Sequence, residues 1–336
     1  MKKLFSLLSM LCMSMGMFAQ GSLLATLSHE GEISTFYGAK ALQDAHNAAV
    51  NGDVITLSSG TFNAVDITKA VAIRGAGMDV DSSTGTLPTI ISGDFNINIS
   101  DAGTNRLTME GLHHKQRITY KGTLTNAMFL KCRFSQIDEG TNSKMVNGSF
   151  IHCKISGFFE LSAGSSASCV NSFIANPVSI NDISSNFEMT NCVVRLERGV
   201  NSVKSSTLIN CAIYVYVTGS YGDFYWEFPS TTSLFNNVSN LDRVWRNCPN
   251  RTNQTAGMDA IFKTYREGYS DSENLELTDE AKTTYLGTDG KEIGIYGGSL
   301  PFSATPTNPQ ITKCEVASKS TADGKLSVDI VVNGAE

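Results

Sequence analysis

A short phrase of alternating apolar and polar residues recurs along the middle of the chain. It reads MFLKCRFSQ at 128–136, SFIHCKISG at 149–157, EMTNCVVRL at 188–196 and TLINCAIYV at 207–215. Alternation with a period of two predicts short strands that bury one face. We call the central residue of each phrase its anchor; the anchors are spaced by 18 to 26 residues and are Gly75, Gly93, Gly111, Cys132, Cys153, Ser172, Cys192, Cys211 and Asn237. A strand repeat of about 20 residues predicts an all-β solenoid, a parallel β-helix of about nine or more coils.

The same pattern predicts which side chains fill the interior. Besides the anchors, we expect two inward columns. One lies two positions before the anchors and contains Ile73, Ile91, Met109, Leu130, Ile151, Val170, Thr190, Ile209 and Phe235. The other lies two positions after them and contains Phe95, His113, Phe134, Ile155, Ile174, Val194 and Ile213. Cysteines suit such a narrow interior because they are small and weakly polar, so we interpret them as packing residues and not as disulfides.

A polar column immediately precedes the anchors on the outward side. In four repeats this position is asparagine, at Asn171, Asn191, Asn210 and Asn236. Successive coils stack at about 4.8 Å, so we expect these amides to form a ladder in which each side chain bonds its neighbour.

Both ends of the repeat carry other patterns. The segment ALQDAHNAAVNGDVITLSSGTFNAVDITKAVAIRGAG at 41–77 reads as an amphipathic helix followed by two strands. The helix is expected over 39–50, with a buried face of Ala41, Leu42, Ala45, Ala48 and Ala49. At the other end, alternating segments at 311–317 and 326–332 flank Asp323-Gly324. Residues 309–336 therefore predict a β-hairpin packed on the last coil, or the start of a further module.

The segment at 41–77 resembles the entry of right-handed parallel β-helix proteins of the pectin-lyase-like superfamily, where such a helix caps the open end of the solenoid. The segment LGTDGKEIGIYGGSLPF at 286–302 resembles the last coil of secreted β-helix proteins common in Bacteroidetes. The resemblance covers most of 36–302 and implies a right-handed β-helix domain over 36–308, with a lead-in at 20–35. It implies no single reaction, because the superfamily includes polysaccharide lyases, hydrolases, adhesins and proteins without known activity.

The first residues predict export. Residues 1–19 contain two lysines, a short apolar run and a small residue at Ala19, which is the layout of a secretory signal peptide. We expect a secreted protein, either periplasmic or on the outer cell surface, and no later segment is apolar enough to predict a membrane helix. Loss of Lys2 and Lys3 with the leader would change the formal net charge from −6 to −8, so nucleic acid is not an expected partner.

One group of polar residues could act as a catalytic site. Glu110, Lys131 and His152 precede three successive anchors, and Arg133 and Lys154 follow two of them. A lyase acting on an acidic sugar needs a base and cations that hold the sugar carboxylate. The same residue types also form ordinary solvated salt-bridge faces, and the sequence leaves both interpretations open.

An aromatic insertion, YVYVTGSYGDFYWEF at 214–228, lies where the anchor spacing lengthens to 26. We expect Tyr221, Phe224, Tyr225, Trp226 and Phe228 to project as a loop that binds a glycan, since aromatic rings suit sugars. Arg243, Trp245, Arg246 and Arg251 could bind an acidic group of that ligand. Alternatively, the aromatic residues pack against the solenoid wall. Asp223 and Glu227 could form an acid–base pair for glycoside hydrolysis if their carboxyl groups lie about 5–9.5 Å apart.

No cofactor is expected from the sequence. His113 falls in an inward column and His114 follows it, without further ligands at a spacing typical of a metal site. The segment DVDSSTG at 79–85 begins like a calcium loop but lacks the expected glycine and final acidic residue. Asp79, Asp81 and Asp94 remain weak calcium candidates.

Three functions are compatible with these patterns. The leading hypothesis is an exported β-helix protein that binds a polysaccharide or another cell-surface ligand through its side wall. The second is a polysaccharide lyase or glycoside hydrolase acting on acidic polysaccharide, and the third is a structural cell-surface protein.

Overall fold

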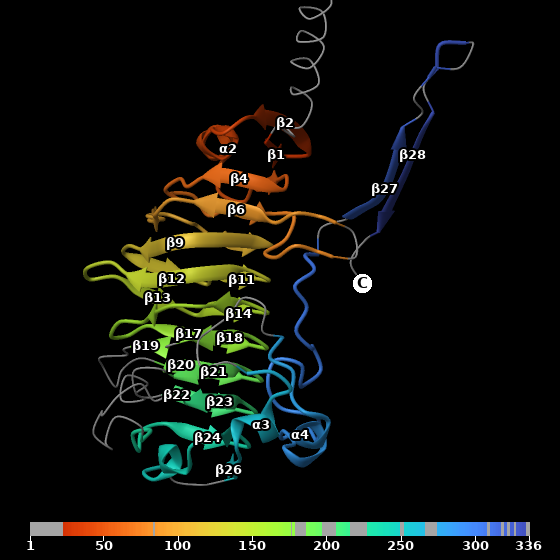
Figure 1. The fold of residues 1–336 in the computed structure, drawn as a ribbon. Helices are drawn as coiled ribbons and strands as arrows, with labels where there is room; N and C mark the ends of the chain where they lie inside the picture. Colours follow the sequence, from red (N-terminus) through yellow and green to blue (C-terminus); the bar gives the residue numbers. More distant parts are fainter. Residues whose placement is uncertain are drawn as a thin grey trace, which may run out of the picture.

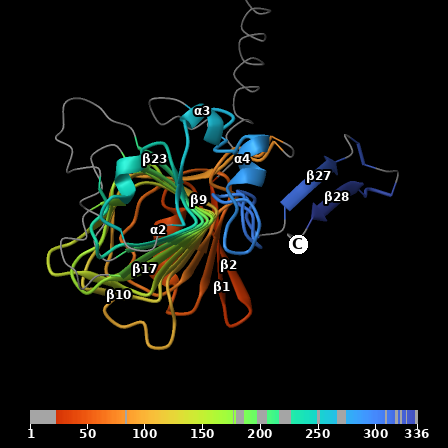
Figure 2. The same ribbon diagram turned by 90° about the horizontal axis from the view of Figure 1, so that it is seen from below.

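The computed structural model describes residues 23–82, 85–175, 177–178, 186–196, 206–215, 227–248, 252–265, 274–307, 310–316, 319–320, 323–325 and 327–333. Over these residues the chain forms the parallel β-solenoid that the repeat predicted, with few helices and about eight turns (Figure 1). Viewed along the solenoid, the strands of successive coils lie almost directly over one another (Figure 2).

Within the described residues, one wall of the solenoid is an eleven-stranded sheet, which we call sheet A. Its strands, in spatial order, are β2 (Glu32–Tyr37), β1 (Leu24–His29), β3 (Val54–Leu57), β5 (Ala72–Arg74), β8 (Thr108–Glu110), β11 (Met128–Leu130), β14 (Gly148–Ile151), β17 (Ser166–Val170), β20 (Asn186–Thr190), β22 (Ser206–Ile209) and β24 (Ser233–Phe235). All neighbours pair in parallel except β1, which is antiparallel to both β2 and β3.

The second wall is a thirteen-stranded sheet in the described part of the chain, called sheet B. Its main path contains β26 (Gln254–Thr255), β25 (Val238–Ser239), β23 (Ala212–Val215), β21 (Val193–Leu196), β18 (Phe173–Ala175), β15 (Lys154–Ile155), β12 (Arg133–Glu139), β9 (Leu112–Tyr120), β6 (Thr89–Ser92) and β4 (Gly60–Asn63). Three short strands pair beside it: β7 (Phe95–Ile97), β16 (Phe159–Glu160) and β19 (Pro177–Val178). A third, two-stranded sheet of β10 (Thr123–Thr125) and β13 (Lys144–Val146) lies between sheets B and A along the chain.

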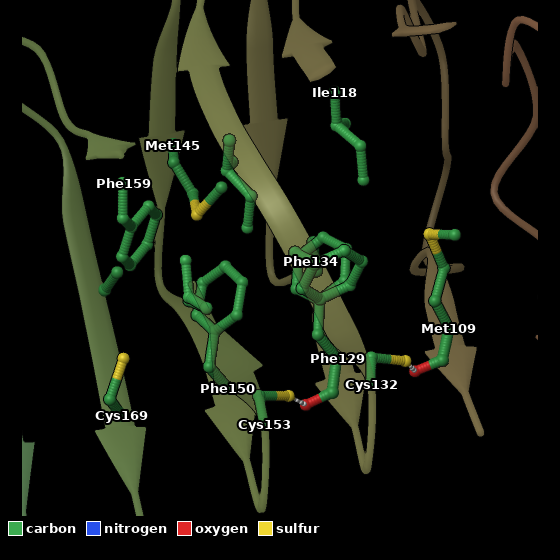
Figure 3. Packing of buried hydrophobic residues seen from close by; sticks show 14 of the residues in the cluster. Met109, Ile118, Phe129, Cys132, Phe134, Met145, Phe150, Cys153, Phe159 and Cys169 are labelled. Atoms are coloured by element: carbon green, nitrogen blue, oxygen red, sulfur yellow. Dashed lines mark hydrogen bonds between the residues drawn. The ribbon is translucent and has the colours of Figure 1, made fainter. Parts of the chain in front are cut away.

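The anchor column lies inside the solenoid, as predicted. Cys132, Cys153, Ser172 and Cys211 are fully buried, and each donates to a backbone carbonyl of the preceding coil. Figure 3 shows this arrangement for Cys132, whose Sγ is 3.4 Å from the Met109 oxygen, and for Cys153. Thiols and hydroxyls therefore replace one another here because each supplies a small buried donor to the same carbonyl position.

The column two positions before the anchors was predicted to face inward, and for six coils this is wrong. The side chains that point inward lie three positions before the anchor and are buried; they are Phe129, Phe150, Cys169, Met189, Leu208 and Leu234. Leu130, Ile151, Val170, Thr190, Ile209 and Phe235 lie on the outer face of sheet A and are partly or largely exposed. The residue between them and the anchor has a positive φ, for example 51° at Lys131, and this left-handed corner interrupts the strand alternation.

The coil count is lower than the spacing suggested because Gly93 begins no coil. Ile73 pairs directly with Met109, so Gly75 and Gly111 belong to consecutive coils. Strand β12 pairs Arg133 with His113 and Phe134 with His114, so the inward position on this coil belongs to His114. His113, which was predicted to point inward, therefore lies on the outer face of sheet B beside Arg133.

Helix α2 (Ala41–Ala48) lies at the N-terminal end of the solenoid with β1 and β2 (Figure 1). Its buried residues include Ala41, Leu42 and Ala45, as predicted, but also His46, whereas Ala48 is exposed. His46 is buried because its Nε2 accepts a hydrogen bond from the Thr68 amide.

Three short helices lie at this end of the chain's path: the first is between β25 and β26 in the last coil, and the other two follow β26. These are the 3₁₀ helix η2 (Asp242–Trp245) and the α-helices α3 (Met258–Ile261) and α4 (Asp279–Thr284). Helices α3 and α4 and the segment after them form a second apolar cluster with the outer face of sheet B, which includes Phe173, Val193, Ala212, Val238, Ile261, Ala281, Ile293 and Ile295.

Residues 286–307, which we call the strap, run back along one edge of the solenoid toward its N-terminal half (Figure 1). The first part of this segment was compared with a last coil, but it contributes no strand to either wall among the described residues. The strap carries the hairpin of β27 (Gln310–Val316) and β28 (Val328–Asn333) to the level of the N-terminal coils. The hairpin was predicted correctly, but it does not lie on the last coil, because the strap places it near the opposite end.

Candidate functional site

The asparagine column binds the strap. The side-chain nitrogen of Asn171 donates two hydrogen bonds, one to the Ile295 carbonyl and one to the Gly297 carbonyl, each at 2.8 Å. Asn210 accepts from the Thr288 amide, and Asn236 donates to the Leu286 carbonyl at 3.2 Å. These described bonds contradict the predicted amide ladder, since the side chains bond the strap backbone and not each other.

The strap also covers the first predicted catalytic group. Glu110, 3 % exposed, accepts hydrogen bonds from the Thr307 amide at 2.7 Å and from the Thr307 hydroxyl. The Lys131 ammonium donates to the Thr305 carbonyl at 2.6 Å. His152 Nε2 lies 3.0 Å from the Leu300 carbonyl. The structure thus places the three residues along one edge, as the repeat predicted, but their polar atoms hold the strap.

Two further cations of that group share a half-buried counter-ion. Asp79 bonds Arg133 at 3.0 Å and Lys154 at 2.8 Å. Burial is the largest single cause acting on the pKa of Asp79, and it raises that pKa. The two cations together outweigh burial, so the pKa of Asp79 is lowered. The Asp79 carboxylate, a calcium candidate in the sequence, is therefore already engaged by two side chains.

Asp94, another calcium candidate, is also engaged by a basic residue. The Asp94 carboxylate accepts from the Arg117 amide at 3.0 Å and pairs with the Arg117 guanidinium at 3.5 Å. Among the described residues, no three histidine, cysteine or acidic side chains gather as metal ligands.

The aromatic insertion is only partly visible. Tyr221, Asp223, Phe224, Tyr225 and Trp226, and also Arg251, lie outside the described residues. The structure therefore does not place these ligand-binding candidates or the proposed Asp223–Glu227 pair.

The end of the insertion and the residues that follow it are packed into the last coil. Phe228 is fully buried and stacks on Trp245 with ring centroids 6.2 Å apart. Both rings were predicted to contact a ligand, and they instead fill the interior because η2 folds Trp245 over Phe228. Glu227 is buried as well and accepts hydrogen bonds from Arg246 at 2.6 Å and Asn247 at 2.7 Å. Arg243, the remaining candidate, is half-buried.

An open groove lies elsewhere, along the edge where the third sheet meets sheet A. Three adjoining hollows of about 330, 410 and 220 Å³ share lining residues: Ala102, Gly103 and Thr125 between the first two, and Asn147 between the last two. The groove spans five successive coils and is lined mainly by Thr104, Asn105, Arg106, Thr125, Asn126, Asn147, Ser149, Ser166, Ser168 and Glu188. Its walls offer amide and hydroxyl groups, which both donate and accept hydrogen bonds.

A short amide ladder forms the floor of the groove. Asn126 and Asn147 have positive φ angles of 54° and 55° at equivalent corners of successive coils. The Asn147 amide nitrogen donates to the Asn126 side-chain oxygen at 3.4 Å, and Ser166 donates to the Asn147 side-chain oxygen at 3.3 Å. The exposed Arg106 has no ion-pair partner among the described residues and offers a cation at this end of the groove, where the exposed Asp101 lines the adjoining hollow.

A pair of carboxylates lies on the outer face of sheet B. Strands β12 and β16 pair Ile137 with Phe159, so Asp138 and Glu160 occupy equivalent positions on strands about 4.8 Å apart. The Asp138 carboxylate accepts from Gln136 at 2.8 and 2.9 Å and lies 3.8 Å from the Arg117 guanidinium. Burial raises the pKa of Glu160, and the Asp138 carboxylate raises it further.

Both features had signals in the sequence that were not used. Asn126 and Asn147 are one coil apart, and asparagine is the residue that most readily adopts a left-handed corner after glycine. Asp138 and Glu160 are also about one coil apart. Grouping polar residues by coil length, independently of the anchors, would have identified both pairs.

Comparisons with protein-family models, curated proteins and solved structures found no match to this chain. None of the described helices is both long enough and apolar enough to cross a membrane.

Proposed function

We propose that this chain is an exported β-solenoid, related to the pectin-lyase-like superfamily, that binds a polysaccharide along the groove beside Asn126 and Asn147. The observation that carries the proposal is the continuity of three hollows across five coils, lined mainly by amide and hydroxyl side chains. Export is supported by the signal-peptide pattern of residues 1–19.

The shape of the groove favours a chain-like ligand over a small compact one. The side chains of Asn126, Asn147 and Ser166 repeat at the coil spacing of about 4.8 Å, so the groove presents similar polar groups at regular intervals. A polyhydroxylated chain offers donors and acceptors that can pair with each interval. Arg106 at one end favours a sugar that carries a carboxylate or sulfate there.

A glycan array followed by affinity gels would test this proposal. The variant Asn126→Gly with Asn147→Gly keeps the left-handed corners and removes both amides. With about 1 kcal/mol for each hydrogen-bonding amide, we expect about 30-fold weaker binding. Asn142→Gly is the matched control because Asn142 is an exposed asparagine with φ 56° outside the groove. Equal affinity of the double variant and wild type would reject the groove as the binding site.

A second candidate function is glycoside hydrolysis at Asp138 and Glu160. Glycosidases use two carboxyl groups, one of which is held protonated to act as the acid. Glu160 has a raised pKa and fits the acid, and Asp138, held by Gln136 and Arg117, fits the nucleophile or base. Two observations favour this candidate function: the strand register that places Asp138 beside Glu160, and the raised pKa of Glu160.

Release of reducing ends from a panel of polysaccharides would test hydrolysis. We expect both Glu160→Gln and Asp138→Asn to lose activity, with Glu276→Gln, a partly exposed carboxylate of another ion-pair cluster, as a control that keeps it. No turnover by wild type on the panel, or equal turnover by Glu160→Gln, would reject this function without affecting the binding proposal.

A further inference from the structure

The distal part of the strap, residues 300–307, is held against the solenoid by three titratable side chains. This segment reads LPFSATPT and carries no charged side chain of its own. Its polar contacts with the solenoid edge are the bonds to Glu110, Lys131 and His152 described above. The attachment of the distal strap therefore depends on the charge states of residues belonging to the solenoid.

His152 is bound in a way that suits only its neutral form. The ring is 7 % exposed, and Nε2 must carry the proton to donate to the Leu300 carbonyl at 3.0 Å. Nδ1 is buried without a hydrogen-bond partner, and the ring lies against Phe302 at 5.8 Å. A second proton would bind Nδ1 and create a buried donor without an acceptor.

The charges around the ring also disfavour protonation. On the preceding coil, the Lys131 ammonium lowers the pKa of His152, in addition to the larger lowering caused by burial, while the Leu300 carbonyl raises it. On the same coil, Lys154 lies 5.5 Å from the Phe302 ring and pairs with Asp79, which also binds Arg133. Glu110, two coils away, has its bonds to Thr307. Asn171 on the next coil is uncharged.

We propose that His152 is a proton-sensitive latch, whose protonation releases residues 300–307 from the solenoid edge and uncovers Glu110 and Lys131. A released ring would regain a pKa near the ordinary value of 6.5, above its value when the strap is closed. The open state therefore binds the proton more tightly, and closure is favoured above pH 6.5. As the pH falls below 6.5, the opening equilibrium rises by up to tenfold per pH unit until the lowered pKa is reached.

Other titrating groups near the strap have separable effects. His113, on the outer face of sheet B, has a pKa lowered to about 4 and lies beside Arg133 and not beside the strap contacts. Glu292, on the proximal strap, has a pKa raised by burial, so its protonation favours the buried state and opposes opening. The substitution His152→Asn isolates the latch, because asparagine occupies the same corner on four other coils and can donate to a strap carbonyl as Asn171 does.

Hydrogen exchange of the intact protein between pH 7.5 and 5, corrected for intrinsic rates, would test the latch. The reporters are the Thr307 amide, bonded to Glu110, and the Phe302 amide, bonded to Ile295, with the Thr288 amide on the proximal strap as reference. In wild type, we expect protection of the reporters to fall by up to tenfold per pH unit below 6.5, relative to Thr288. In His152→Asn we expect this ratio to stay constant.

Equal pH dependence in the two proteins, or constant protection in wild type, would overturn the proposal. The ring titration of His152 in wild type, followed by NMR, gives a second readout that does not depend on the variant folding. A pKa below 6.5 supports the latch, and a pKa at or above 6.5 overturns it.

Discussion

Replacement of Asn171 by alanine should destabilise the solenoid by about 4 kcal/mol. The side chain is 1 % exposed and donates to the Gly297 carbonyl and to the Ile295 carbonyl. Gly297 would be left as a buried acceptor without a donor, at about 1–3 kcal/mol, whereas Ile295 keeps the Phe302 amide and loses about 1 kcal/mol. Alanine at φ 44° adds about 1–2 kcal/mol of left-handed strain.

Urea unfolding followed by circular dichroism would measure this loss, with two comparisons. Asn171→Gly removes the same hydrogen bonds without the strain, so it should be about 1 kcal/mol less destabilising than alanine. Asn142→Ala tests the strain alone, because Asn142 is exposed at φ 56°, and should cost about 1 kcal/mol. If Asn171→Ala costs no more than Asn142→Ala, the strap bonds contribute no stability and the reasoning fails.

Three other predictions concern the interior and sheet B. Phe150→Ala should cost about 3–5 kcal/mol in urea unfolding, because Phe150 is fully buried and stacks on Phe129 at 4.6 Å; a loss below 1 kcal/mol would contradict this packing. Burial raises the pKa of the Cys153 thiol to about 12, so a thiol reagent at pH 8 should label Cys153 only after unfolding, and rapid native labelling would show an open interior. Burial and the Arg133 and Lys115 cations lower the pKa of His113 to about 4, below the ordinary 6.5, so the unfolded chain binds more protons and stability should fall as the pH drops from 6.5 to 4. Urea unfolding of His113→Gln should show a shallower decline over that range, and an unchanged decline would exclude His113 as its cause.

The coil architecture could be predicted because its signal is local and repeated. Each coil shows an alternating phrase around a small buried residue, and errors in one repeat are corrected by the others. The prediction failed at the corner, where the inward residues proved to be Phe129 and Phe150 and not Leu130 and Ile151. A single residue with positive φ changes the side to which all preceding residues point, and simple alternation cannot represent that change.

The candidate sites were harder to predict because their surroundings come from distant parts of the chain. Glu110 and Lys131 were recognised as neighbouring polar residues, but Thr307 and Thr305, which cover them, lie more than 170 positions later in the sequence. The strap has no periodic pattern that would reveal its path, since the solenoid recognises mainly its backbone carbonyls and amides. Burial of an outward residue therefore could not be derived from its position in the repeat.

The two polar columns at each corner have complementary roles that explain their composition. The inward anchors donate to carbonyls of the preceding coil, and this position accepts cysteine, serine or asparagine, as in the bond from Asn237 to the Leu208 carbonyl. The outward corner residues must tolerate a positive φ and also bind the strap, and asparagine meets both requirements better than other residues with a side chain. Lys131 and His152 differ from the asparagines of this column, because each binds the strap through a group that can carry charge. Attachment of the strap is consequently independent of ionisation along the asparagine part of the column and sensitive to it at the distal end.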